Sequence, residues 1–493
     1  MSPDTPDTPD ATRGYDPATY AAVASWSGSD RMSELEATMW RSERHPRQSS
    51  TMTTLFLLDR APDWDRFVEA HDWATSLVAR ARQRVVEPLL PTAPPVWRTD
   101  PHFALSYHLR RAQLGERNTM ADLLELTQTI ALTPFDRTRP LWEATLVEGL
   151  EGGRAAYVLK LHHSVTDGLG TIQLVSMLGS RSRAHTADKP RGVAPTPVEE
   201  SSDPVAVTVE GLAHTLGRTS DLLLGAVDLG AQALVDPRGA MSETLRFGAS
   251  LRRVLSPPPA TPSPLLRPRD ARTWILRTLS CELADLRAAG RVAGGSVNDA
   301  FLAALLGGLR RYHEVHGVEL DELPVTVPVS LRRADDPMGG NRFAGAMFAA
   351  PMGIADPLDR IAAMRGVILG QLTEPALDSL SVITPIANRL PSAVGAAMAR
   401  LSAATDLSAS NMPGLTEDVY LAGAKIERVY PFGPLPGVAI MAVLLTHMGR
   451  CGIGLTIDGS ALDDVDVLMT CMQEGLDEVL AVGRPRRRGT SRR

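Results

Sequence analysis

The sequence contains very little lysine. Lys160, Lys189 and Lys425 are the only three lysines among 493 residues, so nearly all of the positive charge is carried by arginine. The net charge of -6 is small for a chain of this length. Nothing in this balance indicates a protein that binds nucleic acid through its overall charge, because such proteins are strongly basic.

Cysteine is almost as rare as lysine. Cys281, Cys451 and Cys471 are odd in number and widely spaced, so they fit neither a disulfide framework nor a clustered metal site. This usage indicates a reducing cytosol. The N-terminus carries a Pro-Asp-Thr repeat in place of a basic segment followed by an apolar one, so it does not have the pattern of a secretory signal.

Long hydrophobic runs are absent as well. The longest apolar stretch, residues 437–445, is far shorter than the ~20 residues needed to cross a bilayer. We therefore expect a cytoplasmic protein, and we also expect contact with the inner face of the membrane or with lipid inclusions. The six arginines among residues 483–493 have two interpretations, a solvated tail or a segment attracted to anionic lipid.

Several catalytic fingerprints are missing from the sequence. There is no Gly-x-Ser-x-Gly element of a serine hydrolase and no P-loop. The segment Gly168-Leu169-Gly170 lacks the third glycine of a dinucleotide-binding turn. These absences argue against nucleotide hydrolysis, hydride transfer and a serine nucleophile of the α/β-hydrolase type.

The pattern of hydrophobic and turn-forming residues predicts two mixed α/β domains. A hydrophobic content of 44% supports ordinary globular cores, and strand-like and helix-like patterns alternate in both halves. Clusters of Pro, Ser and Thr near residues 194–204 and 256–268 flank a segment of helical character, residues 206–255. The predicted organisation is a disordered tail (1–30), an N-terminal domain (31–182), a crossover linker with surface helices (183–268), a C-terminal domain (269–482) and an arginine-rich tail (483–493).

Periodicity locates the main elements of both domains. The predicted strands are residues 51–58, 141–148, 155–161, 274–279, 323–328 and 452–457. The predicted helices are residues 31–40, 120–133, 169–178, 297–315 and 463–482.

One segment carries most of the chemical information. The strand that ends near Leu161 runs directly into His162 and His163, and Asp167 and Gly168 follow at fixed offsets before a helix. An imidazole titrates near neutrality and can accept a proton from a hydroxyl group. Adjacent strand residues point to opposite faces, so only one histidine can face a substrate and the other should anchor the loop.

The other two residues of the segment have expected structural roles. We expect Asp167 to pair with an arginine and to shape the turn. Gly168 either lets a substrate approach the backbone closely or supplies an unusual dihedral angle. Two other interpretations of the histidine pair are a zinc site and a purely structural pair. A zinc site is disfavoured because adjacent strand histidines diverge and no His-Glu-x-x-His or Cys pair accompanies them.

The His-His-x-x-x-Asp-Gly segment resembles that of the bacterial wax ester synthase/diacylglycerol acyltransferase family, within the larger superfamily that includes condensation domains and chloramphenicol acetyltransferase. The likeness extends over residues 31–482. Further matching segments are residues 97–111, the Pro140-Leu141-Trp142 element, Ser296-Val297-Asn298-Asp299, residues 328–332, Gly340-Asn341 and Ser410-Asn411-Met412-Pro413-Gly414. Two segments depart from the family pattern: residues 50–54 replace a Met-His-Val-Gly-like stretch, and Leu415 replaces a proline.

The resemblance implies two related chloramphenicol-acetyltransferase-like α/β domains with an active-site tunnel between them. It implies that His163 is the general base, supported by His162, Asp167 and Gly168. The residues expected to bind substrate or line the tunnel are Pro140, Leu141, Trp142, Asn298, Asp299, Ser410 and Asn411. Asn298 and Ser410 are candidate donors to the oxyanion of the transition state.

The implied reaction is transfer of a fatty acyl group from acyl-CoA, a substrate, to a long-chain alcohol or a diacylglycerol, with no cofactor and no metal. The products would be wax esters or triacylglycerol. Two other functions stay open at this point. One is a condensation-type acyltransferase with a non-lipid acceptor, and the other is a catalytically silent lipid-binding protein.

Overall fold

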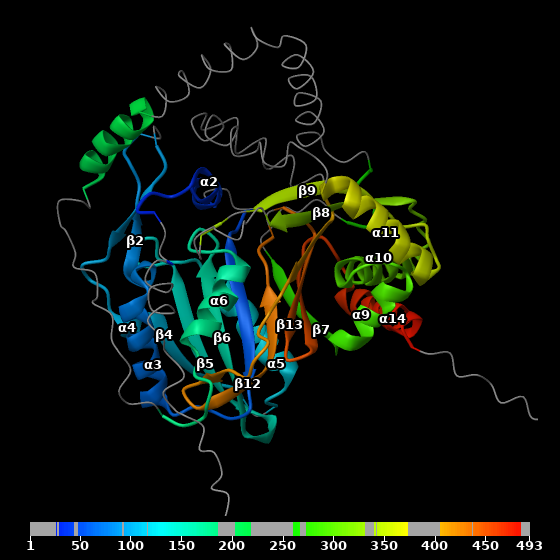
Figure 1. Ribbon diagram of the computed structural model, residues 1–493, viewed down its shortest axis with the longest axis horizontal. Coiled ribbons are helices and arrows are strands. Elements are labelled where there is room, and N and C mark those ends of the chain that lie inside the picture. Colours follow the sequence, from blue (N-terminus) through cyan, green and yellow to red (C-terminus); the bar gives the residue numbers. More distant parts are fainter. Residues whose placement is uncertain are drawn as a thin grey trace, which may run out of the picture.

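Two six-stranded sheets form the centre of the molecule (Figure 1). The computed structural model describes Trp26 and residues 29–43, 48–90, 93–115, 117–185, 203–217, 260–266, 273–330, 340–341, 343–372, 405–435 and 437–484. The first sheet has the order β11-β12-β1-β6-β5-β4, and the second has the order β7-β14-β13-β10-β8-β9. A small third sheet pairs β2 (Gln83–Val86) with β3 (Val96–Thr99).

The strands of the first sheet come from both halves of the chain. They are β1 (Thr51–Leu58), β4 (Leu109–Gln113), β5 (Trp142–Leu150), β6 (Arg154–His162), β11 (Tyr420–Leu421) and β12 (Ala424–Phe432). The helices of this half are α2 (Glu34–Ser42), α3 (Trp64–Leu77), α4 (Leu105–His108), α5 (Met120–Leu132) and α6 (Gly168–Leu178), with short 3-10 turns η1 (Ala79–Arg82) and η2 (Glu151–Gly153). A further helix covers residues 204–217.

The second half carries its helices on one face of its sheet (Figure 1). Its strands are β7 (Trp274–Glu282), β8 (Glu322–Ser330), β9 (Phe343–Pro351), β10 (Leu407–Met412), β13 (Ile440–His447) and β14 (Arg450–Asp458). Its helices are α9 (Leu283–Val292), α10 (Val297–Val315), α11 (Pro357–Leu372) and α14 (Val465–Val482).

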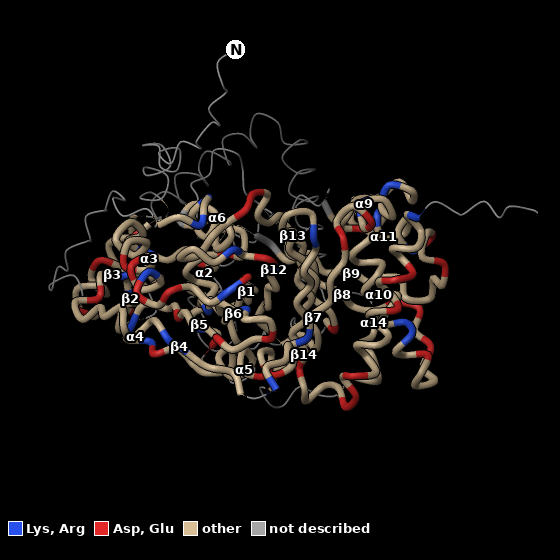
Figure 2. The backbone as a smooth tube through the Cα atoms, turned by 90° about the horizontal axis from the view of Figure 1, so that it is seen from below, with Lys and Arg blue, Asp and Glu red and all other residues tan. Residues whose placement is uncertain are grey.

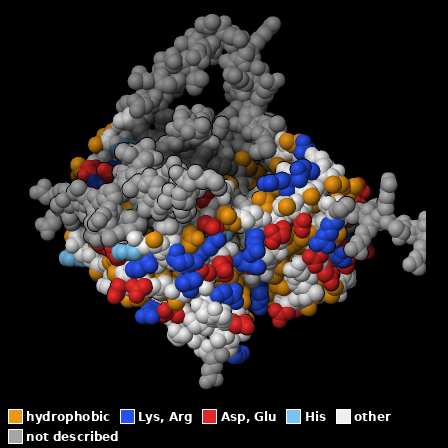
Figure 3. Space-filling view, turned by 60° about the horizontal axis from the view of Figure 1, so that its bottom comes forward, with side chains coloured by type: hydrophobic (Ala, Val, Ile, Leu, Met, Phe, Trp, Pro, Cys, Tyr) orange, Lys and Arg blue, Asp and Glu red, His pale blue; other side chains and the backbone are white. Residues whose placement is uncertain are grey.

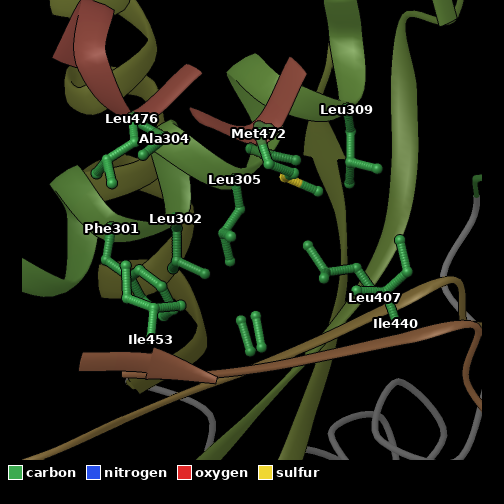
Figure 4. Packing of buried hydrophobic residues seen from close by; sticks show 14 of the residues in the cluster. Phe301, Leu302, Ala304, Leu305, Leu309, Leu407, Ile440, Ile453, Met472 and Leu476 are labelled. Carbon is green, nitrogen blue, oxygen red and sulfur yellow. The ribbon is translucent and has the colours of Figure 1, made fainter. Parts of the chain in front are cut away.

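Helix α10 is the central element of the second domain. It is apolar on nearly all sides, as expected of a helix that is covered on every face. Phe301, Leu302 and Leu305 face the strands that carry Ile440 and Ile453 (Figure 4), and all five side chains are buried. Helix α14 packs against the opposite side of α10 and completes this core.

Strand β12 ties the two halves together. It pairs antiparallel with β1 of the first sheet, where Thr53 is opposite Phe432, and its other face packs on β14 of the second. A Cβ atom at Gly452 would lie 2.0 Å from the carbonyl oxygen of Val429, and one at Gly454 would lie 1.9 Å from that of Pro431. These glycines therefore let the backbone of β12 rest directly on β14.

This exchange corrects the predicted domain division. Residues 420–432 fall inside the predicted C-terminal domain, 269–482, but they form part of the first sheet. The order of segments along a chain does not indicate which sheet edge a strand will join, so the sequence pattern could not reveal the crossing.

The predicted disordered tail is too long by at least a few residues. Trp26 lies inside the predicted tail but is only 2% exposed and belongs to the core of the first domain. The rest of residues 1–28, most of the linker 183–268 and the arginine tail beyond Arg484 lie outside the described residues. Within the linker, the structure shows a helix over residues 204–217, and the rest of the predicted helical segment, 218–255, lies outside the described residues.

Charged residues lie mainly around the outside of the two domains (Figure 2). Arginine and acidic side chains are mixed on the face shown in Figure 3, with apolar atoms between them. Some of the charged side chains form ion pairs, and Arg183 Nη2 lies 2.6 Å from Oδ2 of Asp59. No single helix of the described chain is long and apolar enough to cross a bilayer; α9 and α10 meet the length and composition criteria only as a pair bent by 93°.

Candidate active site

Strand β6 places the two histidines on opposite sides of the first sheet. The His162 backbone N–H donates to the Leu141 carbonyl, 3.1 Å away, and the His163 N–H donates to the Ser50 carbonyl at 2.7 Å. The end of the strand is therefore held from both sides. The His163 side chain lines a cavity between the sheets, and the His162 side chain is fully buried on the other face. This is the arrangement that the alternation of strand residues predicts.

The His163 imidazole is oriented by Asn341. Nδ1 of His163 lies 2.8 Å from Oδ1 of Asn341, and Nδ2 of Asn341 donates to the His163 carbonyl at 2.7 Å. Nδ2 also donates to Oε1 of Glu36, 3.3 Å away. Because the amide nitrogen must serve these two acceptors, Oδ1 faces the ring and accepts from Nδ1–H. In this tautomer Nε2 carries the lone pair, which is what a general base requires.

Burial lowers the pKa of His163 below its ordinary value, and the charge of Asp167 and the bond to Asn341 oppose that shift only in part. The direction follows from the cost of placing an imidazolium ion in a buried site. The ring is therefore neutral, and able to accept a proton, throughout the neutral pH range.

His162 anchors the turn from the other side of the sheet. Its Nδ1 accepts from the Ser164 N–H at 3.1 Å and lies 2.6 Å from the Ser164 hydroxyl. Its Nε2 faces Oε2 of Glu43 at 3.3 Å. The edge of the ring packs against Trp40, with ring centres 5.8 Å apart. His162 thus supports the loop and does not reach the cavity.

Asp167 and Gly168 begin helix α6. Oδ1 of Asp167 accepts from the Gly170 N–H at 2.8 Å and so caps the helix, which is the turn-shaping role expected of it. Its pairing with an arginine remains a prediction. The Gly168 φ angle is not in the left-handed region, and a Cβ atom there would lie 2.4 Å from Sδ of Met412. The structure therefore does not use Gly168 for an unusual dihedral angle. The close neighbour that it shows is the Met412 side chain, and the approach of a substrate to this backbone stays a prediction.

The Pro140-Leu141-Trp142 segment supports the histidine strand from outside the main cavity. Pro140 and Leu141 are buried and do not line this cavity, contrary to the prediction of a tunnel-lining role. Trp142 donates from Nε1 to the Ala81 carbonyl at 2.8 Å, and its ring stacks on His108 with centres 4.5 Å apart. Trp142 instead lines a second, smaller cavity.

Asn298 and Asp299 lie in the first turn of helix α10, in the second domain. The Asp299 carboxylate accepts from the backbone N–H of Ser296 at 2.7 Å, and the Ser296 hydroxyl accepts from the Asp299 N–H, which together cap α10. Neither Asn298 nor Asp299 lines either cavity. The proposed oxyanion role of Asn298 is therefore not supported by its position.

The main cavity lies between the two domains, as the expected tunnel does. Its volume is about 410 Å³, within the range usual for small-molecule sites. Ser410 and Asn411 both line it from β10, and apolar side chains form most of the remaining wall. The lining residues from β1, β6 and α2 include Leu35, Met39, Met52, Leu159 and Leu161; those from the second half include Pro328, Met412, Met441, Val443 and Leu445.

Sequence reasoning missed the function of Asn341 although it singled out Gly340-Asn341 as a family-like element. The residue lies 178 positions from His163, and no local pattern reports a contact at that separation. The sequence feature that could have indicated this role is the Gly340-Asn341 element itself, which places a glycine and an amide side chain between two strands. Gly340 accepts from the Asp167 backbone N–H at 3.3 Å, so this element meets the histidine loop directly.

No three metal-ligating side chains come together within the described ranges. The two histidines diverge onto opposite faces of the sheet. The arrangement of the pair therefore favours a base with an anchoring neighbour over a shared metal ion.

Replacing Asn341 with leucine is expected to lower kcat by about 10- to 100-fold while changing KM little, because the ring loses the acceptor that selects its Nδ1–H tautomer. The pH profile of kcat/KM should shift as well, since the Asn341 bond raises the pKa of His163. Asn341→Asp keeps the acceptor for Nδ1–H but loses the Nδ2 donor to the His163 carbonyl and to Glu36, so comparison of the two variants isolates the contribution of the acceptor. A variant with unchanged kcat and pH profile would contradict the orienting role.

Two buried histidines behind Trp142 predict acid sensitivity of the fold. His71 and His108 both have the pKa lowered to about 4 by burial, from an ordinary value of 6.5. The unfolded chain binds protons more readily, so the free energy of unfolding should fall as the pH drops through this window. The expected loss between pH 7 and pH 5 is about 2 kcal/mol for each histidine.

Chemical denaturation at the two pH values measures this loss. His108→Asn keeps a donor for the Trp142 carbonyl, which His108 Nδ1 reaches at 2.7 Å, and removes the titrating group. Between pH 7 and pH 5, the free energy of unfolding of this variant should fall by about 2 kcal/mol less than that of the natural chain. Equal losses in the two proteins would show that His108 is not the group responsible.

The two sheets, the exchanged strand and the strand-end histidine define a two-domain acyltransferase of the His-His-x-x-x-Asp-Gly class. Three solved structures share the fold. The wax ester synthase/diacylglycerol acyltransferase from Marinobacter aquaeolei VT8 superposes with a TM-score of 0.61 at 21% identity, over 92% of this chain and 100% of that one. The first condensation domain of the CDA synthetase gives 0.57 at 13% identity, over 93% and 97%. The starter condensation domain of rhizomide synthetase, in complex with C8-CoA, gives 0.57 at 13% identity, over 94% and 97%.

Sequence comparison identifies the family within this class. Residues 29–301 match the wax ester synthase/diacylglycerol acyltransferase catalytic domain, and residues 339–479 match the C-terminal domain of the same family. A Mycobacterium tuberculosis H37Rv protein, provisionally named a diacylglycerol O-acyltransferase, is 41% identical over 458 residues, 92% of each chain. The chain therefore belongs to the wax ester synthase/diacylglycerol acyltransferase family.

Proposed function

We propose that the protein transfers a fatty acyl group from acyl-CoA to a long-chain alcohol or a diacylglycerol, with His163 as the general base. The observation that carries the proposal is the position of this imidazole. It lies at the end of a strand with Nδ1 bound to Asn341, and it lines an apolar cavity between two domains. Family membership supports the choice of acyl-CoA and a lipid alcohol as substrates.

The reaction requires one proton acceptor and one oxyanion site. Nε2 of His163 takes the proton of the alcohol as its oxygen attacks the thioester carbonyl, and a tetrahedral oxyanion forms. The carbon–sulfur bond then breaks, and the CoA thiolate recovers the proton from the imidazolium ion. Ser410, which lines the cavity, is the better placed of the two predicted oxyanion donors. The transfer is direct and uses no cofactor and no acyl-enzyme.

Asn341 and Asp167 support this chemistry electrostatically. The Asn341 oxygen accepts the Nδ1 proton, which gains acidity when the ring becomes positive, and the Asp167 charge favours the imidazolium ion. Both therefore stabilise the charge that develops on His163 in the transition state more than they stabilise the resting enzyme.

Contact with a lipid surface is part of the proposal. The helix of residues 204–217 exposes Val205, Val209 and Leu212 at helical spacing, and Leu89 beside it is 65% exposed. Leu89 N–H donates to the Thr208 hydroxyl, so the four side chains belong to one surface region. We place the protein in the cytoplasm, with this region touching the inner face of the membrane or a lipid inclusion. Co-sedimentation with vesicles of phospholipid that carries no net charge tests the contact. Protein left in the supernatant would argue against it.

The first test is release of CoA. The purified full chain is incubated with palmitoyl-CoA and either hexadecanol or dipalmitoylglycerol, and free thiol is followed with a thiol reagent. Release that depends on the alcohol supports acyl transfer, and the preferred alcohol identifies the product. A folded protein that binds palmitoyl-CoA and releases no CoA with either alcohol would overturn the proposal and favour a non-lipid acceptor or a lipid-binding role.

A further inference from the structure

A second cavity of about 150 Å³ lies inside the first domain, and the reaction proposed above makes no use of it. Its lining residues come mainly from α3, β5, β6, α6, β11 and β12. Ala74, Trp142, Tyr157, Val175, Leu421 and Ile426 are among the residues that line it.

This second cavity adjoins the main one. Leu159, Leu161 and Thr171 line both, so these three side chains form the partition between them. On β6, Tyr157, Leu159, Leu161 and His163 alternate onto the same face of the sheet. His163 and Tyr157 therefore lie at the two ends of one row of side chains on β6, about 20 Å apart at strand spacing.

The lining of the second cavity suits an uncharged, apolar ligand. Its polar groups already have partners: Nε2 of His71 accepts from the Tyr157 hydroxyl at 3.1 Å, and Nδ1–H of His71 donates to the Phe67 carbonyl at 2.8 Å. Burial raises the pKa of Tyr157 and lowers that of His71, so both are neutral. The Thr75 and Thr171 hydroxyls donate to the carbonyls of Asp72 and Asp167. Most of the other lining residues are aliphatic or aromatic.

We propose that the second cavity binds the methyl end of a single unbranched alkyl chain that passes the partition and whose reacting end lies at His163, and that the small volume of the cavity limits the length of that chain. The proposal rests on the proposed acyl transfer. Either the fatty acyl chain of the thioester or the chain of the alcohol supplies this chemistry. A ligand with two chains side by side does not fit so small a space.

Filling the second cavity from its far wall tests the proposal. Ala74 lies on α3, away from His163 and from the partition, so Ala74→Leu occupies the cavity and leaves the catalytic groups in place. Ala79→Leu is the matched control, because Ala79 lines neither cavity. Activity is measured over an acyl-CoA series from octanoyl to stearoyl with one alcohol, and over an alcohol series from octanol to octadecanol with one acyl-CoA.

Ala74→Leu should shift the optimum of one series to shorter chains, with kcat/KM for the longest member falling about fourfold for each methylene excluded. The other series and the control should stay unchanged. Leu161→Ala opens the partition and should shift the same series to longer chains. The series that responds identifies the substrate whose chain enters the cavity.

The proposal is overturned if Ala74→Leu leaves both chain-length profiles unchanged or lowers both uniformly. Failure of the proposed reaction gives a different result. If no alcohol supports CoA release, equilibrium binding of the acyl-CoA series and of the alcohols to both proteins still reports on the cavity. A chain-length-dependent loss of binding in Ala74→Leu supports the subsite in the absence of turnover, and equal binding refutes it.

Discussion

Replacing His163 with alanine is expected to reduce acyl transfer by about 10²- to 10⁴-fold, the usual contribution of a positioned general base. The loss should appear in kcat, because the imidazole acts on the proton that moves in the transition state and contributes little to binding of either lipid chain. Measurement of CoA release under saturating palmitoyl-CoA and hexadecanol gives the value.

Two controls separate this effect from loss of structure. His316→Ala removes a histidine that pairs with Asp464 at 2.8 Å at the end of α10, in the other domain, and should leave kcat unchanged. Palmitoyl-CoA binding and the circular dichroism spectrum of His163→Ala should match those of the natural chain. A folded His163→Ala protein that retains more than a tenth of the activity would exclude His163 as the base.

The second large effect concerns the crossing of β12 over β14. Gly454→Ala is expected to lower the free energy of unfolding by about 3 kcal/mol, at the upper end for one added methyl group in a packed core. The new Cβ would lie 1.9 Å from the Pro431 carbonyl oxygen. Pro431 and Gly454 both lie in paired strands, so neither residue can move away from the other without disturbing a sheet. Urea denaturation measures the change.

Gly366→Ala is the matched control for this substitution. Gly366 lies in α11 with no atom within 4 Å of its added Cβ, so the change should stabilise the protein by up to about 1 kcal/mol through helix propensity. The Gly454→Ala protein should also lose activity, because Pro431 and Phe432 form part of the cavity wall beside the crossing. Stability equal to that of the natural chain would show that β12 does not rest on β14 at this point.

Elements with strong local patterns could be predicted from the sequence. The strand Thr51–Leu58 and the helix Val297–Val315 have the predicted bounds. Their periodicity reflects burial on one side or on all sides, which is a local property of the residues. The split of His162 and His163 onto opposite faces follows from the same geometry.

Features that depend on distant contacts could not be predicted. The bond from His163 to Asn341 and the choice of sheet that β12 joins each depend on where the folded chain brings a partner. The register of β7 and β14 places Cys281 opposite Cys451, although 170 positions separate them and their spacing shows no pattern. The resemblance to known sequences identified the family. It also led to the prediction that Asn298 lies in the site, and the structure was needed to test that prediction.

The exchanged strand also has a consequence for biosynthesis. Strand β1 pairs with β12, and Lys425 N–H bonds to Asp59 across 366 positions of the sequence. While the chain is being synthesised, the edge of β1 that β12 will cover stays open until about 430 residues have left the ribosome, so the histidine-bearing sheet cannot close as an independent early unit. An open strand edge of this kind invites pairing with other chains. We therefore expect truncation after the linker to yield aggregating fragments, and folding in the cell to depend on chaperones that protect the first sheet until its last strand arrives.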